Sequence, residues 1–248
     1  MGNSFKDHFS GHSELYAAAR PTYPEELFLW IAGLPKERKV AWDVATGNGQ
    51  AAIALSHHFS RVIATDASEN QIESAPDTPG ITFRTEKAES PSLGDSTVDL
   101  VTVAQGAHWF DLERFFVSVD RVLKPYGILA LWCYEKCTIN EEVDKLIESY
   151  YQSLDPYWPP ERKLVEEGYS AIRFPYEETI APAFQMSISW TASQMLAYLE
   201  SWSATQKATA ALKLDPLEEI RHELLRRWGN CDQEVIWPVS MRVGPKPG

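Results

Sequence analysis

Cysteine is scarce in this chain of 248 residues, with only Cys133, Cys137 and Cys231. A disulfide framework needs a denser and usually even set, so the count excludes one and indicates reduced thiols. The Cys133–Cys137 spacing could begin a metal site, but no second pair follows, and Cys133 falls inside an apolar run. We therefore expect no metal ion, and thiols that only pack.

Basic residues and long apolar runs are also in short supply. Lysine and arginine number 23 against 35 acids, which gives a formal net charge of −12. A nucleic-acid partner normally requires a basic face, so DNA and RNA are excluded as partners. The longest apolar run, 127–134, is too short to span a bilayer, and residues 1–10 show no apolar signal region. These absences predict a soluble, cytoplasmic protein that acts on a small molecule, and they leave its oligomeric state open.

The chain does contain a regular alternation of strand and helix patterns between about residues 36 and 136. A strand–helix–strand rhythm predicts βαβ units, parallel pairing and right-handed crossovers. The predicted strands are Lys39–Val44, Arg61–Asp66, Ile81–Thr85, Val98–Val103 and Gly127–Tyr134. The predicted helices between them are Gly49–His58, Gln71–Ala75 and Leu112–Leu123.

The flanking segments have a different pattern. Before the core, Thr22 is a candidate N-cap for a helix with Pro24 in its first turn. After the core we expect helices at Asn140–Leu154, Ala192–Ser201 and Pro216–Trp228, and strands at Phe184–Ser189 and Glu234–Val243. The simplest organisation is one domain over residues 1–248. Its parts are an N-terminal segment 1–35, a core at about 36–136, and a C-terminal cap with the last strands at 137–248.

The most informative stretch is Ala41–Gln50, with the sequence AWDVATGNGQ. It is typical of a short strand that enters a glycine turn and opens a helix. Glycine lets a backbone approach a ligand closely because it has no Cβ. A second apolar stretch, Arg61–Asp66, ends in an acid that can accept hydrogen bonds from both hydroxyls of a ribose. Together they predict a nucleoside-containing cofactor across the C-terminal edge of a parallel sheet.

Two cofactors compete for this turn, because residues 47–52 also satisfy the dinucleotide pattern G-x-G-x-x-A. Asp43, at the end of the first strand, would repel a pyrophosphate but attract the ammonium and sulfonium of S-adenosylmethionine. Alanine at the third glycine position and the lack of a Tyr-x-x-x-Lys group also count against a dinucleotide. The turn alone favours S-adenosylmethionine, with a dinucleotide site or an unliganded turn as alternatives.

Several blocks resemble class I S-adenosylmethionine-dependent methyltransferases with a type 11 methyltransferase domain, over most of the chain. Asp43–Gln50 is similar to the family's first motif, D-x-G-x-G-x-G/Q, and Asp66-Ala67-Ser68 resembles its ribose-binding acid. Lys87-Ala88-Glu89 resembles the segment beside adenine, and Arg121–Gly127 is close to R-V-L-K-P-G-G. The resemblance implies a Rossmann-like α/β fold. Its seven-stranded, mostly parallel sheet would have helices on both faces, an antiparallel last strand, and N- and C-terminal helical cap segments.

A narrower resemblance, to the subgroup that contains trans-aconitate methyltransferases, rests on blocks outside these core motifs. They are Tyr16, Arg20-Pro21-x-Tyr23-Pro24, Gln105–Asp111, Ser201–Ser203 and Trp237-Pro238. Better-known members of that subgroup methylate carboxylates of small acids.

Two residues depart from the family pattern. Ala45 stands where the first glycine is usual, which is harmless at negative φ but strains the loop at positive φ. Tyr126 replaces a glycine in a turn expected to lie away from the cofactor.

The resemblance implies roles for individual residues around the cofactor. Gly47 and Gly49 would let backbone amides approach its methionine part, and Asp43 would lie near its ammonium, directly or through water. Asp66 would accept the ribose hydroxyls. The full predicted cofactor-binding set is Asp43, Ala45, Gly47, Gly49, Asp66, Ala67, Gln71, Ala88, Glu89, Gln105 and Trp109.

The acceptor side is less determined. His108 could act as a general base for a hydroxyl or amine, whereas a carboxylate needs no base, and His108 would then only position it. Trp109 could pack on the cofactor or belong to the core. Tyr16 and Arg20 lie in a segment that could close over the donor, where Arg20 could pair with a substrate carboxylate or with a surface acid. Most other tryptophans should be core, with one or two lining an acceptor pocket.

The leading hypothesis is therefore methyl transfer from S-adenosylmethionine to a small molecule, most readily to a carboxylate or other oxygen. A C-methyltransferase of quinone-type biosynthesis, an NAD(P)-dependent oxidoreductase and a non-catalytic cofactor-binding module remain as alternatives.

Overall fold

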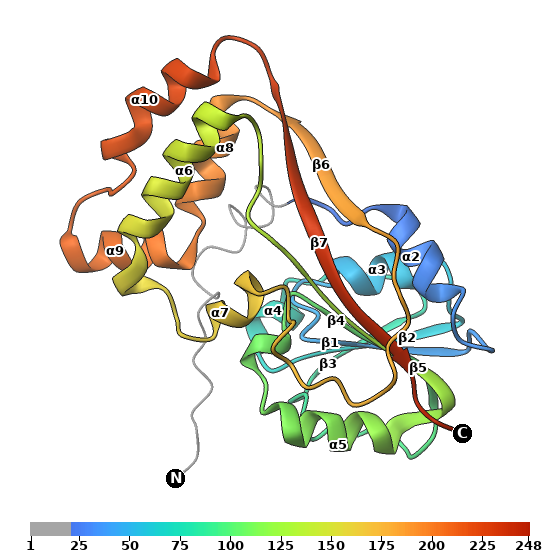
Figure 1. Ribbon diagram of the computed structural model, residues 1–248. Coiled ribbons are helices and arrows are strands. Elements are labelled where there is room, and N and C mark those ends of the chain that lie inside the picture. The colour runs from blue at the N-terminus through green and yellow to red at the C-terminus, as the bar shows by residue number, and fades with distance from the viewer. Residues whose placement is uncertain (1–20) are drawn as a thin grey trace.

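A computed structural model describes residues 21–248 and contains one seven-stranded sheet (Figure 1). Its strands are β1 (Val40–Val44), β2 (Arg61–Asp66), β3 (Ile81–Thr85), β4 (Val98–Ala104), β5 (Leu123–Tyr134), β6 (Phe184–Trp190) and β7 (Gln233–Pro245). The spatial order is β3-β2-β1-β4-β5-β7-β6. The first five strands pair in parallel, and β7 runs antiparallel to both β5 and β6. The predicted Rossmann-like architecture is confirmed.

Helices cover both faces of the sheet because the central strands are apolar on both sides. One face, with Ala41, Leu100 and Ile128, packs under α2 (Glu25–Ala32) and α3 (Gln50–Ser56). The opposite face carries the neighbouring residues Trp42, Val101 and Leu129 and packs against α5 (Leu112–Val122). Burial on both faces explains the continuous apolar runs of β1 and β4. The short helix α4 (Glu69–Glu73) contacts β2 and β3.

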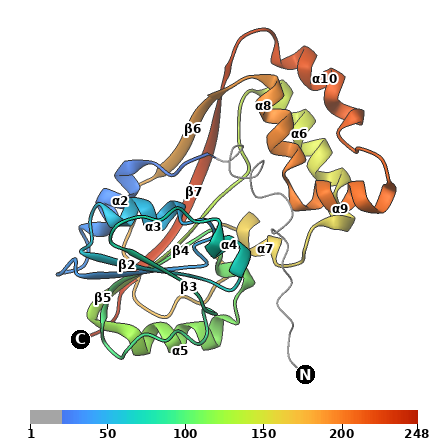
Figure 2. The same cartoon turned by 180° about the vertical axis from the view of Figure 1, so that it is seen from behind.

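The segment after β5 forms a second, helical body, the cap. It comprises α6 (Glu141–Ser153), α8 (Ala192–Glu200), α9 (Ser203–Leu212) and α10 (Glu218–Trp228), which lie together at one end of the molecule (Figures 1 and 2). The cap has its own apolar core, in which Val143, Met195 and Leu224 are fully buried. Two short helices, η2 (Asp155–Tyr157) and α7 (Arg162–Glu166), lead from α6 back toward the sheet.

Several predicted boundaries need correction. Thr22 is not the N-cap of α2, because Pro24 occupies that position in an extended conformation and makes no side-chain cap. β5 begins at Leu123 rather than at Gly127, since Leu123 already pairs with Val98 of β4. The helices α7 and α9 were not predicted. Within residues 21–248, no helix combines the length and apolarity needed to cross a bilayer.

Candidate active site

The ends of three adjacent strands bring the predicted cofactor residues together. Val44 of β1 pairs with Thr65 of β2 on one side and with Val103 of β4 on the other. The next residue along each strand therefore reaches the same edge of the sheet. The chain leaves β1 toward β2 on one side and returns to β4 on the other, so this edge is the topological switch point where open α/β sheets bind ligands.

The turn after β1 consists of alternating left-handed residues. Ala45, Gly47 and Gly49 have φ values of +53°, +57° and +91°. A Cβ on Gly49 would lie 2.9 Å from the ring of Phe83, so both its conformation and its packing require glycine. Ala45 adopts the left-handed conformation that its glycine-like position demands. Of the two possibilities for Ala45, the structure therefore shows the one with positive φ. This left-handed conformation strains the loop by about 1 kcal/mol.

Ala45 also fixes the identity of a residue on the neighbouring loop. A Cβ placed on Gly106, just after β4, would lie 2.6 Å from the Cβ of Ala45. Such a separation is far inside van der Waals contact, so Gly106 must lack a side chain while Ala45 has one. The loops after β1 and β4 thus pack directly on each other.

Asp66 lies at the foot of the glycine turn, as predicted. Its two carboxylate oxygens accept hydrogen bonds from the backbone N–H groups of Gly47 and Ser68, each at 2.9 Å. Ala67 follows it, and the Gln71 side chain reaches within 3.7 Å of where a Cβ on Gly47 would be. The half-buried carboxylate is therefore oriented by backbone amides at the edge where a ribose is expected.

Asp43 is fully buried behind this turn. Its carboxylate accepts hydrogen bonds from the hydroxyls of Thr46 at 2.6 Å and Thr102 at 2.8 Å. Burial raises its pKa from 3.8 to about 6, although both hydroxyls favour the charged form. The carboxylate exposes no surface and lies behind Thr46 and Thr102. A direct contact with a ligand is therefore disfavoured, and its charge would act on a ligand at a distance.

In the segment predicted to lie beside adenine, the side chains of Ala88 and Glu89 take part in the fold. Ala88 is buried, and the Glu89 carboxylate accepts the backbone N–H of Asp111 at 2.9 Å, near the start of α5. The Glu89 carbonyl accepts from the Ser118 hydroxyl at 2.8 Å. The Glu89 side chain is thus engaged in the fold, which leaves the backbone as the part of this segment suited to a ligand.

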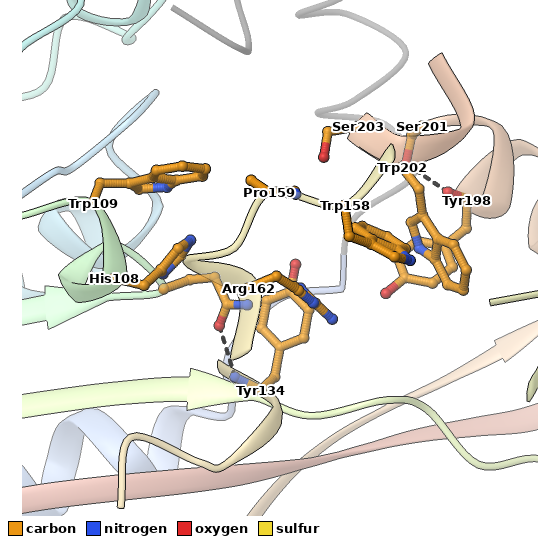
Figure 3. A pocket seen from close by; sticks show the side chains of 11 residues that line it. His108, Trp109, Tyr134, Trp158, Pro159, Arg162, Tyr198, Ser201, Trp202 and Ser203 are labelled. Atoms are coloured by element: carbon orange, nitrogen blue, oxygen red, sulfur yellow. Dashed lines mark hydrogen bonds between the residues drawn. The ribbon is translucent and has the colours of Figure 1, made fainter. Parts of the chain in front are cut away.

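A pocket extends from the residues after β4 into the cap (Figure 3). Gln105, at φ +61°, turns its side-chain oxygen back to accept the Tyr134 backbone N–H at 2.8 Å. This bond ties the end of β4 to the end of β5. The described lining residues are Gln105, His108, Trp109, Tyr134, Trp158, Pro159, Arg162, Tyr198, Ser201, Trp202 and Ser203.

His108 is buried on the core side of this pocket. Its Nδ1 lies 3.2 Å from the Tyr169 hydroxyl, and its ring lies 4.5 Å from that of Trp109. The direction of the bond to Tyr169 depends on the imidazole tautomer. Burial raises the pKa of Tyr169 well above its usual value, so this phenol stays protonated. Trp109 is half-buried and lines the pocket, so it is not a core residue.

Comparison with known proteins identifies the family. Residues 42–131 match the family described as "Methyltransferase domain". The chain is 35% identical over 252 aligned positions to a protein of Dictyostelium discoideum named as a methyltransferase, covering 98% of this chain and 96% of the relative. This chain belongs to the S-adenosylmethionine-dependent methyltransferases.

Solved structures agree. A protein of Anaeromyxobacter dehalogenans described as a type II methyltransferase is 36% identical, with a TM-score of 0.86 over 92% of this chain and 99% of that one. An S-adenosyl-L-methionine-dependent methyltransferase of Methanococcus maripaludis, 15% identical with a TM-score of 0.51 over 100% and 98%, shares the fold. The oxidoreductase and the non-catalytic binding module are thereby set aside as interpretations of the glycine turn.

As a member of this family, the protein uses S-adenosylmethionine as its cofactor. When bound, it supplies a methyl group on a positively charged sulfonium. The residues present fit such a cation: Asp43 keeps a buried carboxylate that no lysine or arginine of residues 21–248 pairs with, and Asp66 lies near enough to raise its pKa further. Within the same residues, no cluster of three or more His, Cys, Asp or Glu side chains could hold a metal ion.

The tryptophans divide between the pocket and the core. Of the five tryptophans expected to be mostly core, Trp132, Trp190 and Trp237 are buried, whereas Trp158 and Trp202 line the pocket of the methyltransferase. Tyr16 and Arg20 lie outside the described residues. Arg162 was missed, because nothing in its local sequence distinguishes it from a surface arginine, although the Pro- and aromatic-rich stretch 155–160 just before it was a visible signal.

Proposed function

We propose that this methyltransferase transfers the methyl group to an oxygen of a small molecule, most readily to a carboxylate. The observation that carries the proposal is the charge of the pocket. Its described lining contains one arginine and one histidine but neither Asp nor Glu. A site of this composition favours an anion over a cation.

An amine acceptor fits this pocket less well. Amines are mostly cationic near pH 7, so they must lose a proton before they can attack a methyl group. The aromatic faces that could hold a cation are already next to one, since the Arg162 guanidinium lies 5.2 Å from the ring centre of Trp158. A carboxylate is already ionised and nucleophilic, so alignment with the donor suffices.

The finer resemblance to trans-aconitate methyltransferases supports the same choice. Two of the blocks that carry it, Gln105–Asp111 and Ser201–Ser203, lie far apart in the chain, yet residues of both line the pocket. A third block contributes Trp237 of β7, which is buried against the cap and donates its indole N–H to the Tyr198 hydroxyl at 3.1 Å. Residues of these subgroup blocks therefore meet at one pocket, where Gln105 and Trp109 of the predicted cofactor-binding set also lie.

Roles follow from this reaction. Asp66 would bind the ribose hydroxyls, Gly47 and Gly49 would admit the methionine part, and Asp43 would balance its positive charge. His108 would position the acceptor rather than remove a proton, because a carboxylate has none to lose.

The first test is calorimetric titration with S-adenosylmethionine, S-adenosylhomocysteine and NADPH. We expect the two adenosyl compounds to bind in the micromolar range and NADPH to bind far more weakly. The protein is then incubated with labelled S-adenosylmethionine and a panel of small carboxylic acids. Label in a product that mild base releases as methanol identifies a carboxyl ester. Base-stable label in a quinone precursor would instead identify the C-methyltransferase alternative and overturn the proposal.

A further inference from the structure

The Arg162 side chain is a cation that lines the pocket and has no counter-ion among residues 21–248. It is half-buried at the first position of α7, and Figure 3 shows it between the His108–Trp109 side and the Trp158–Trp202 side. No carboxylate of residues 21–248 lies within ion-pair distance of its guanidinium. Holding a guanidinium away from bulk water without an anion is unfavourable, so an arginine kept in this way is suited to an anionic ligand.

Its orientation is fixed by neighbours that leave part of the guanidinium unused. Nε donates a hydrogen bond to the Tyr151 hydroxyl at 3.3 Å, and that hydroxyl donates in turn to the Glu166 carboxylate. Glu166 thus restrains the arginine through Tyr151 instead of pairing with it. The two terminal amino groups make no hydrogen bond within residues 21–248. Terminal amino groups held in one plane match the two oxygens of a carboxylate.

The walls beside Arg162 are aromatic on the cap side. Trp158 stacks on Tyr151 with ring centres 4.7 Å apart, and Trp202 lies 5.6 Å from Trp158 and 5.8 Å from Tyr198. On the core side the pocket is lined by Trp109. Aromatic walls on both sides favour a flat, apolar body by burial and by offset or edge-on ring contacts.

We propose that Arg162 anchors the carboxylate of the acceptor, and that this acceptor is an acid with a flat aromatic or conjugated body rather than a short aliphatic acid. The inference rests on the proposed function and extends it to a residue and to the shape of the substrate. The anchor acts by charge pairing and orientation, so Arg162 is a positioning and specificity residue that takes no part in bond making.

The test uses the full chain saturated with S-adenosylhomocysteine and three probes: cinnamate, its uncharged analogue cinnamamide, and the aliphatic acid hexanoate. We expect cinnamate to bind at least about ten-fold more tightly than either of the others, because only cinnamate offers both the charge and the flat body. Binding is measured by calorimetry and by quenching of tryptophan fluorescence, to which Trp158 and Trp202 contribute among the nine tryptophans of the chain.

Three variants locate the effect. Arg162→Met should remove the preference for cinnamate over cinnamamide, and Arg162→Lys should keep part of it, since a lysine retains the charge but loses the planar fork. Lys163→Met is the matched control, because its side chain on the same helix is 77% exposed and should leave the preference unchanged. S-adenosylhomocysteine affinity should be the same in all three.

Equal binding of cinnamate and cinnamamide to the unaltered protein, or a preference that survives Arg162→Met, would overturn the anchor. Hexanoate binding as tightly as cinnamate would overturn the flat body, and binding of none of the probes would overturn both. Each of these results leaves the proposed function standing if S-adenosylhomocysteine binds and acids are methylated. Failure of S-adenosylhomocysteine to bind the unaltered protein would instead remove the proposed function itself.

Discussion

The sheet edge and the cap side of the pocket differ in the side chains that they offer to a ligand. We expect the edge to bind the donor through the left-handed turn at Gly47, the half-buried Asp66 and the buried Asp43. The cap side of the pocket has no acid among its described lining residues and offers aromatic rings around Arg162. The family match ends at residue 131, before the cap begins. The matched region contains the predicted donor site, and our proposal assigns selection of the acceptor to the pocket beside the cap.

The charges of the two regions are complementary to the two reactants. A cationic donor would meet the carboxylates of Asp43 and Asp66 at the edge, and an anionic acceptor would meet the Arg162 cation beside the cap. Substitutions at the sheet edge should therefore lower donor affinity, whereas substitution of Arg162 should lower acceptor selectivity. The following predictions test that separation.

The largest effect is expected for Asp66→Ala. The substitution removes a carboxylate whose charge-assisted hydrogen bonds to two ribose hydroxyls would each contribute about 1.5–3 kcal/mol. S-adenosylhomocysteine affinity, measured by calorimetry, should fall by about 100-fold or more. The matched control is Asp95→Ala, because that exposed acid pairs with Arg121 at 2.9 Å and should leave the affinity unchanged. Unaltered affinity in a folded Asp66→Ala protein would show that the edge does not bind the ribose.

The second prediction concerns Asp43, where stability and binding should move in opposite directions. Its pKa is raised by burial from 3.8 to about 6, so the folded protein holds this proton over a pH range where the unfolded chain has released it. The folded state therefore loses stability as pH rises from about 4 to 6 and does not regain it above. A shift of about two pKa units corresponds to about 3 kcal/mol.

Asp43→Asn removes this buried charge and should increase the free energy of unfolding at pH 8 by about 1–3 kcal/mol, with little gain at pH 4. Because the cationic donor loses its counter-charge, its affinity should fall about ten-fold or more. Urea unfolding and calorimetry measure the two effects. Asp99→Asn is the control, since Asp99 is also buried but pairs with Lys124 at 2.6 Å and holds the first residues of β1. It should lower stability and leave donor affinity unchanged; the same pattern in Asp43→Asn would contradict the prediction.

A third prediction tests whether the two loops of the donor edge are coupled as their packing implies. Gly106→Ala should destabilise the fold by about 1–3 kcal/mol, because its new methyl group collides with that of Ala45. In an Ala45→Gly background the same change should cost much less, since Gly106 has a φ of −118° that alanine tolerates. Denaturant unfolding of the four proteins gives the coupling energy. Additive effects of the two substitutions would exclude the contact.

The two regions also differ in how far the sequence predicts them. The donor edge follows from local signals: a strand period, a glycine turn, and an acid at the end of β2 were sufficient to place Asp66 beside Gly47. The contact of Ala45 with Gly106 depends on the pairing of Val44 with Val103, which local sequence does not specify. In the cap, no local pattern brings Arg162 to the same pocket as His108, because their proximity results from long-range packing of the chain after β5.

The smallest effect is expected at His108, which lies where the two regions meet. If the acceptor is a carboxylate, no proton needs to be removed, so His108→Asn should lower kcat by less than about ten-fold, whereas loss of a general base costs about 100-fold or more. Tyr169→Phe is the companion variant, since it removes the hydroxyl that lies 3.2 Å from Nδ1 and keeps the ring. The rate of ester formation between about pH 6 and 9 should keep its shape in both variants, because positioning by hydrogen bonding adds no ionisation to the profile. A large loss in His108→Asn, together with the disappearance of an ionisation near neutral pH, would instead assign His108 as a base. The acceptor would then carry a proton, and the charge complementarity drawn between sheet edge and cap would no longer describe this enzyme.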